Sequence, residues 1–146
     1  MEITLTKEQY ETLIKLVYLG NWMVNAHRAE DDRLEKFDDL ESYVLSFAQH
    51  EGLDNCADYD EDADRYYLSR EFEESQVMPY LDEYDRDTFW EELIDNLSYR
   101  DFFNAYGEIA VRRMTQEEGF SALQTFVQKY EKEFETHGTD NLVIHE

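Results

Sequence analysis

The stretch Thr115–Gly138, TQEEGFSALQTFVQKYEKEFETHG, contains the clearest helix signal in the chain. Thr115 and Glu118 have the spacing of a capping box, in which each side chain satisfies a backbone N–H of the other residue. The apolar residues that follow recur at steps of three and four and therefore share one helix face. They are Phe120, Leu123, Val127, Tyr130 and Phe134. Gly138 is a typical stop signal, so the stretch predicts an amphipathic helix that ends there.

Similar signals predict two helices near the N-terminus. Thr6 and Gln9 form a second capping box and open a helix from about residue 7 to residue 28. A further helix is expected over residues 33–50, because its apolar residues again recur at steps of three and four. Gly52 is a plausible end for this helix.

The middle of the chain predicts a loop followed by shorter helical segments. Residues 53–64 are rich in acids and have the composition of a loop, and a helix is expected from about residue 66 to residue 76, ended or kinked at Pro79. Asp87 is a good N-cap for the next helix. Ser98–Asp101 resembles another capping box, and the helix after it could be interrupted at Gly107.

These signals together define the expected fold class. Only five Gly and one Pro interrupt 146 residues, which favours long helices over a multi-stranded sheet. We expect a mainly α protein, a compact single domain over residues 1–146 built as a bundle of about five to six helices. Ile3–Leu5 and Asn141–Ile144 could pair as a small two-stranded ribbon from the termini.

The net charge of -23 is the strongest indication of function. Between Glu30 and Asp101 there are 25 acidic residues and six basic ones. Nucleic acid and anionic membranes would repel such a surface, because both are bound by Lys and Arg. The charge is therefore either tolerated for solubility, with no dedicated electrostatic role, or used to bind something positive.

The compartment follows from the termini and the cysteine content. A single cysteine, Cys56, excludes a disulfide within the chain and suits a reducing compartment. The first residues have no basic start followed by an apolar run, and no apolar stretch approaches the roughly 20 residues that span a bilayer. We therefore expect a cytoplasmic protein with no membrane partner.

The densest acids are interleaved with tyrosines, which supply interface area at low entropic cost. The leading hypothesis is a non-catalytic interaction protein that binds a basic protein, for example as a nucleic-acid mimic or an inhibitor. The sequence gives no oligomeric state. The candidate partner-binding residues are Asp58, Asp60, Asp62, Asp64, Glu73, Glu74, Asp82 and Asp85.

Two carboxylate patterns suggest divalent metals instead. Asp60, Asp62, Asp64 and Glu71 stand at positions 1, 3, 5 and 12 of a calcium-loop pattern, but Arg65 occupies position 6, where the turn requires Gly. A solvated acidic loop is the simpler interpretation of this segment.

The second pattern is Glu71-x-x-Glu74 followed by Glu92-x-x-Asp95. Carboxylates three residues apart share a helix face, so two helices could direct four carboxylates at one Mg²⁺. Over about 25 residues this resembles the all-helical nucleoside triphosphate pyrophosphohydrolases. The resemblance implies an alternative function, Mg²⁺-dependent hydrolysis of a nucleotide. Ordinary solvated helix faces explain the same spacing.

Other catalytic chemistry has little support in the sequence. The four histidines show no close-spaced ligand pair, and no nucleophile elbow or glycine-rich phosphate loop is present. Acidic neighbours should raise rather than lower the pKa of Cys56. The sequence therefore names no catalytic residue and favours a protein that is not an enzyme.

Overall fold

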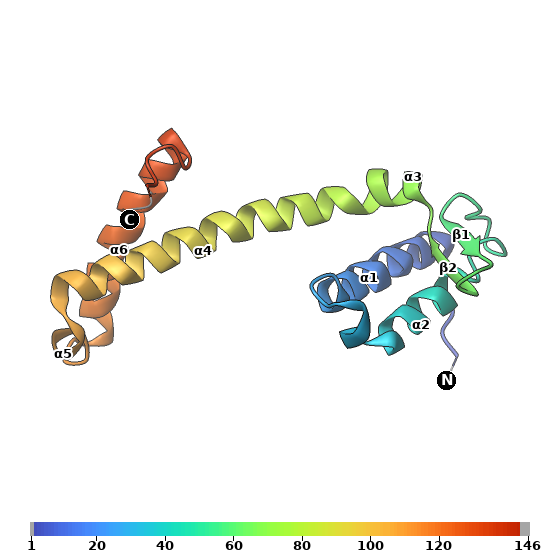
Figure 1. Cartoon of the computed structure of the whole chain (residues 1–146), viewed down its shortest axis with the longest axis horizontal. Helices are drawn as coiled ribbons and strands as arrows, with labels where there is room; N and C mark the ends of the chain where they lie inside the picture. The colour runs from blue at the N-terminus through green and yellow to red at the C-terminus, as the bar shows by residue number, and fades with distance from the viewer. Residues whose placement is uncertain (1, 144–146) are drawn as a thin grey trace. The chain divides into compact units, whose positions relative to one another are not determined.

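The computed structural model describes residues 2–143 of the chain (Figure 1). Its elements are α1 (Lys7–Asn25), the 3₁₀ turn η1 (Glu30–Asp32), α2 (Glu35–Leu45), β1 (Ala57–Asp60), β2 (Arg65–Leu68), α3 (Arg70–Phe72), the π-helix η2 (Glu73–Val77), α4 (Met78–Tyr106), α5 (Glu108–Val111) and α6 (Gln116–His137). Backbone contacts divide the chain into two compact units, residues 1–83 and 84–146. Each unit is described separately below.

In the first unit, α1 begins at the predicted capping box and packs against α2, which ends at Leu45 and not near residue 50 as Gly52 suggests. The Thr6 hydroxyl accepts a hydrogen bond from the Gln9 backbone N–H (3.3 Å), and the Gln9 side chain accepts one from the Thr6 N–H (2.9 Å). The Tyr10 hydroxyl donates to the Val44 carbonyl oxygen (2.5 Å) and so ties the two helices together. The most deeply buried side chains of this core are Ile14, Leu45, Ala48, Cys56 and Val77.

The prediction of a loop over 53–64 and a helix over 66–76 is wrong in part. Strands β1 and β2 form an antiparallel hairpin in which Ala57 pairs with Leu68 and Asp60 with Arg65. Tertiary packing decides this, because Leu68 and Ala57 are buried in the core beside the helices. Helical backbone begins only at α3, which the Ser69 side chain caps.

Three helix ends predicted from the sequence are wrong, because α4 runs without interruption from Met78 to Tyr106. Pro79 does not end the helix but lies in its first turn, directly after the π-helical turn η2. A proline lacks its N–H and crowds the carbonyl four residues earlier, and a wider turn relieves that conflict. Asp87 and Ser98 are therefore interior residues of α4 and not N-caps. The helix ends before Gly107, whose φ of 75° lies in the left-handed region, so the possible interruption noted at this glycine is present.

The second unit consists of the rest of α4 with α5 and α6. The capping box at Thr115 is formed, and α6 ends at Gly138 (φ 55°), so both ends of this helix are confirmed. Its core is largely aromatic: the Phe102 and Phe126 ring centroids lie 6.2 Å apart, and Trp90 and Phe134 lie 5.6 Å apart.

The mainly helical class with a small two-stranded antiparallel sheet is confirmed, but the strands are not those expected at the chain ends. Residues 3–5 have no regular structure, and Ile144 lies outside the described residues. The single domain over residues 1–146 stays a prediction, which the cooperativity of unfolding would test. Within residues 2–143, every helix is either too short or too polar to cross a membrane.

Candidate partner interface on the acidic hairpin

The hairpin of the first unit presents acids and tyrosines on a defined register. Directly paired residues in antiparallel strands point to the same side of the sheet. Asp58 therefore shares a side with Tyr67, while Tyr59 shares the other side with Tyr66, and these two rings pack at a centroid distance of 4.9 Å. The strand register therefore fixes the side of the hairpin on which each of these acidic and tyrosine side chains lies.

The tip of the hairpin is closed by its own acids. The Asp60 carboxylate accepts hydrogen bonds from the backbone N–H groups of Asp62 (2.9 Å) and Ala63 (3.1 Å). Asp64 adopts a φ of 53°, a left-handed conformation that Asp tolerates better than most residues. Its carboxylate accepts a hydrogen bond from the Tyr59 hydroxyl, which raises the pKa of that tyrosine. Negative charge is therefore part of how this turn is built.

Contacts with α2 hold the hairpin in place. The Arg65 guanidinium lies 2.6 Å from the Asp39 carboxylate, and the Tyr66 backbone N–H donates to the Ser42 hydroxyl (2.9 Å). A hollow of about 480 Å³ lies alongside. Its lining residues are Asp39, Ser42, Tyr43, Ser46, Tyr59, Asp64, Arg65 and Tyr66.

The eight predicted partner-binding acids occupy different surroundings. All four of the hairpin, Asp58, Asp60, Asp62 and Asp64, are exposed. They belong to the run from Ala57 to Asp64, which contains five acids and no base. The whole hairpin therefore carries five acids and one base, Arg65.

The other four acids lie on helical backbone. Glu73 is half-buried and accepts a hydrogen bond from Tyr18, whereas Glu74 is paired with Arg70 at 2.7 Å. Asp82 and Asp85 are exposed on successive turns of α4, in the first and second unit respectively. Glu73 is the least suitable of the eight for binding a partner, because its side chain is half-buried and already hydrogen-bonded to Tyr18.

The residues of the two metal patterns lie on several elements. Asp60, Asp62 and Asp64 belong to the hairpin and Glu71 to α3; Glu74 follows on η2, and Glu92 and Asp95 are exposed within α4. The Asn96 side chain donates to the Glu92 carbonyl (2.7 Å) and weakly to its carboxylate (3.4 Å). Within residues 2–143, no three His, Cys, Asp or Glu side chains are grouped in a way that could hold a metal ion.

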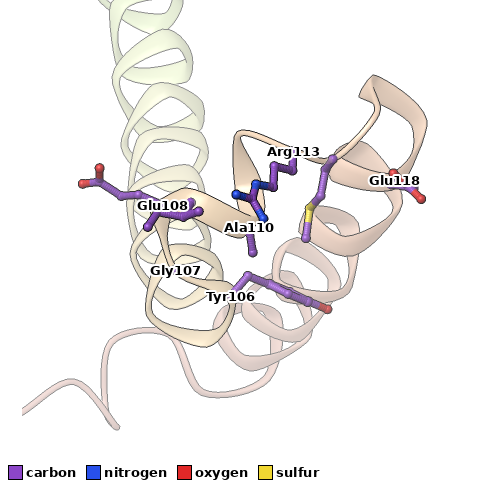
Figure 2. A pocket seen from close by; sticks show the side chains of 8 residues that line it. Tyr106, Gly107, Glu108, Ala110, Arg113 and Glu118 are labelled. Carbon is purple, nitrogen blue, oxygen red and sulfur yellow. The ribbon is translucent and has the colours of Figure 1, made fainter.

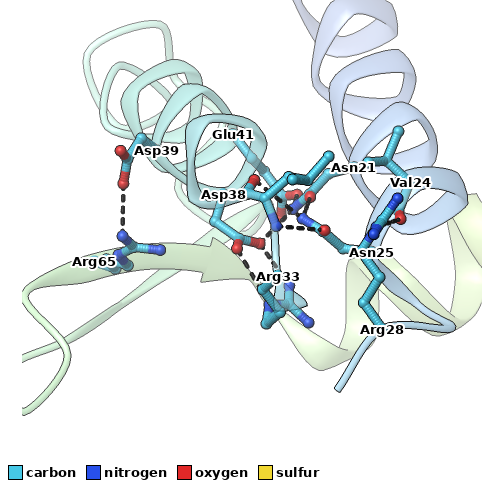
Figure 3. Close-up of polar contacts among 10 residues, drawn as sticks. Asn21, Val24, Asn25, Arg28, Arg33, Asp38, Asp39, Glu41 and Arg65 are labelled. Atoms are coloured by element: carbon cyan, nitrogen blue, oxygen red, sulfur yellow. Dashed lines mark hydrogen bonds and ion pairs between the residues drawn. The ribbon is translucent and has the colours of Figure 1, made fainter. Parts of the chain in front are cut away.

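A buried polar network between α1 and α2 was not predicted (Figure 3). The Asn21 amide donates to Glu41 (2.6 Å) and to Asp38 (2.9 Å), and its oxygen accepts from the Asn25 amide (2.8 Å). Arg33 completes the network through Asp38, at 2.5 and 3.2 Å. Two asparagines four residues apart inside a helix, where Asn is a poor helix former, were the available signal.

The network separates the pKa values of its two carboxyl groups. Hydrogen bonding to Arg33 lowers the pKa of Asp38, whereas burial raises the pKa of Glu41. Burial likewise raises the pKa of the Cys56 thiol, which lies in the core and not in an exposed loop. Glu41 is thus an acid held inside the unit, unlike the exposed acids of the hairpin.

The second unit contains a different hollow, of about 910 Å³, where α4 gives way to α5 (Figure 2). Tyr106, Ala110 and Arg113 surround it, with Glu108 and Glu118 at its edges. These side chains combine one cation with two acids. The charges of this hollow are therefore closer to balance than those of the hairpin, which has five acids and one base.

Comparisons of the chain with protein-family models, with curated proteins and with solved structures gave no match.

Proposed function

We propose that the protein is a non-catalytic interaction protein that binds a basic protein partner through its acidic hairpin. The supporting observation is the presentation of Asp58, Asp60, Asp62 and Asp64 on an element fixed to α2 by Arg65. Rigid carboxylates lose little conformational freedom on binding, whereas acids on a disordered loop would lose more. The partner would be a basic protein of the cytoplasm, including one whose own function is to bind nucleic acid.

The charge of this surface acts mainly on the rate of association. A concentrated negative field steers a cationic protein toward the correct encounter and can raise the association rate by about 10- to 1,000-fold at low salt. The exposed tyrosines beside the acids, Tyr59 and Tyr67, would then supply apolar contact area. This division predicts that the hairpin acids control the association rate and the tyrosines control dissociation.

The test compares two variants with equal changes in charge. The first reverses Asp58, Asp60, Asp62 and Asp64 to Lys; the matched control reverses four exposed acids of the second unit to Lys. The control residues are Glu91, Glu131, Glu135 and Asp140. Association with a poly-lysine chain of defined length is measured by stopped flow from 20 to 300 mM salt.

We expect the hairpin variant to associate at least tenfold more slowly at low salt and to show a flatter salt dependence. The control should change much less, because its charges lie on other elements. Equal slowing in both variants would mean that total charge alone drives association, and it would refute the hairpin as a partner site.

The magnesium-dependent hydrolase is separated from this proposal by calorimetry. Titration of the chain with Mg²⁺ at fixed ionic strength is repeated on a Glu92→Gln/Asp95→Asn variant. Under the proposed function, the heats are weak and the same in both proteins. Saturable binding of one or two ions that is lost in the variant would replace the proposal with the hydrolase.

A further inference from the structure

The first unit has an apolar groove along α1 and α2 that the proposed function does not use. Its volume is about 630 Å³. The residues that form most of its apolar wall are Leu5, Leu13, Leu16, Tyr43, Val44 and Phe47. Leu16 is 61% exposed and Tyr43 is 64% exposed, so the wall includes large side chains that the unit itself leaves uncovered.

The groove follows from the wide apolar arc of α1. One side of the arc, at Tyr10 and Ile14, is buried in the core, while Leu16 lies outside it. The hydrogen bond from Tyr10 to the Val44 carbonyl holds α1 and α2 together along this edge. The groove is thus bounded by two helices that are fixed to each other.

The groove and the hollow beside the acidic hairpin share one lining residue. Tyr43 lines both the groove and the hollow that contains Asp39 and Asp64. The first unit as a whole has 22 acids and seven bases. A ligand that covers both places must therefore bring apolar side chains and positive charge together.

We infer that the groove binds an amphipathic, basic helix of the partner. The inference rests on the proposed function and specifies the form of the partner. From Glu8 to Leu16 the groove follows α1 for about 12 Å, at 1.5 Å per residue. Apolar residues at positions i, i+3 or i+4, and i+7 of a helix span about 10 Å, which matches this length. The cationic face of the same helix would lie toward the hairpin acids.

Charge complementarity favours this occupant over a second copy of the chain. Two copies would bring together two units with the same large excess of acids, and that repulsion works against their association. A basic helix replaces this repulsion with attraction.

The test uses a fluorescent 18-residue helix of Leu and Lys in an amphipathic pattern and a peptide of the same composition with the pattern scrambled. Binding to the full chain is measured by anisotropy at 150 mM salt. The groove variant is Leu16→Ser/Tyr43→Ser. Its matched control is Ile109→Ser/Phe120→Ser, which removes two equally exposed apolar residues from the second unit. Circular dichroism checks folding, and Leu16→Lys is a second groove variant at an exposed helical position.

We expect wild type to bind the patterned peptide at least tenfold more tightly than the scrambled one. Both groove variants should lose this preference and the control should keep it. Equal binding of the two peptides to wild type would overturn the groove inference, and so would loss of the preference in the control. A wild-type dimer that Leu16→Ser/Tyr43→Ser dissociates in sedimentation would assign the groove to a second copy.

The hairpin reversal variant separates this inference from the proposed function. If the patterned peptide binds wild type no more tightly than the scrambled one, and both lose affinity on hairpin reversal, the acidic surface is supported and the groove inference is refuted. If reversal changes neither peptide, the proposed function fails, whatever the groove variants show.

Discussion

Replacement of Asn25 by Ala should strongly destabilise the first unit. Asn25 is 1% exposed. Its amide group donates to the Asn21 oxygen at 2.8 Å, and its own oxygen accepts the Leu34 backbone N–H at 3.0 Å. Alanine removes both contacts and leaves the buried Asn21 oxygen and the Leu34 N–H without these partners.

The expected magnitude follows from those two contacts. The buried Asn21 oxygen left without its partner costs about 1–3 kcal/mol, and loss of the hydrogen bond of the Leu34 N–H, on an exposed residue, costs about 0.5–1.5 kcal/mol, so the two together cost about 1.5–4.5 kcal/mol. Alanine recovers about 0.5 kcal/mol, because it is a better helix former than Asn. The net loss should be about 1–4 kcal/mol. With a urea slope of about 1 kcal/mol per molar for a unit of this size, the midpoint should fall by about 1–4 M.

The assay follows Trp22, which lies on α1, in a Trp90→Phe background so that fluorescence reports on the first unit alone. The matched control is Gln49→Ala, which removes an exposed amide from the same unit and should cost less than about 0.5 kcal/mol. A loss for Asn25→Ala no larger than that of the control would show that the polar network does not stabilise the helix pair.

Three further predictions concern single sites. Burial raises the pKa of Glu41, so its favourable contribution is present below its unfolded pKa and is lost as pH rises through the folded value. Glu41→Gln should therefore gain stability relative to wild type as pH rises above about 4.5 in urea unfolding; an unchanged difference would contradict this. Hydrogen bonding to Tyr130 lowers the pKa of Asp101 to about 2, so the stability it contributes should be lost as pH falls from about 4 to 2. Acid titration followed by Trp90 fluorescence should show a weaker transition in Asp101→Asn, and identical curves would refute the assignment. Gly107→Ala should lower the melting temperature because φ is 75°, whereas Gly119→Ala, in the interior of α6 with no atom within 4 Å of its added Cβ, should raise it.

Several helix ends could be predicted because neighbouring residues decide them. The capping boxes at Thr6 and Thr115 and the glycine stop at Gly138 depend on backbone groups a few residues away. The excess of negative charge could also be counted from the sequence, because ionisation of most acidic and basic side chains at neutral pH depends little on the fold. These local terms were sufficient for the mainly helical class.

The candidate site depends on contacts that no local pattern contains. Asp58 to Asp64 have the composition of a loop, and they form a hairpin because Ala57 and Leu68 are buried in the core beside α1 and α2. Likewise, nothing in the sequence distinguishes Glu73 from an exposed acid, but it is half-buried and accepts a hydrogen bond from Tyr18 of α1.

The two predicted N-caps inside α4 do not begin new helices, for the same reason. Asp87 and Ser98 are good N-caps only where a helix begins, and continuous packing keeps the backbone helical through both. Helix class, caps and charge are thus properties of neighbouring residues. The hairpin, the groove and the exposure of each acid result from burial between distant segments, whose free energy exceeds the local preferences.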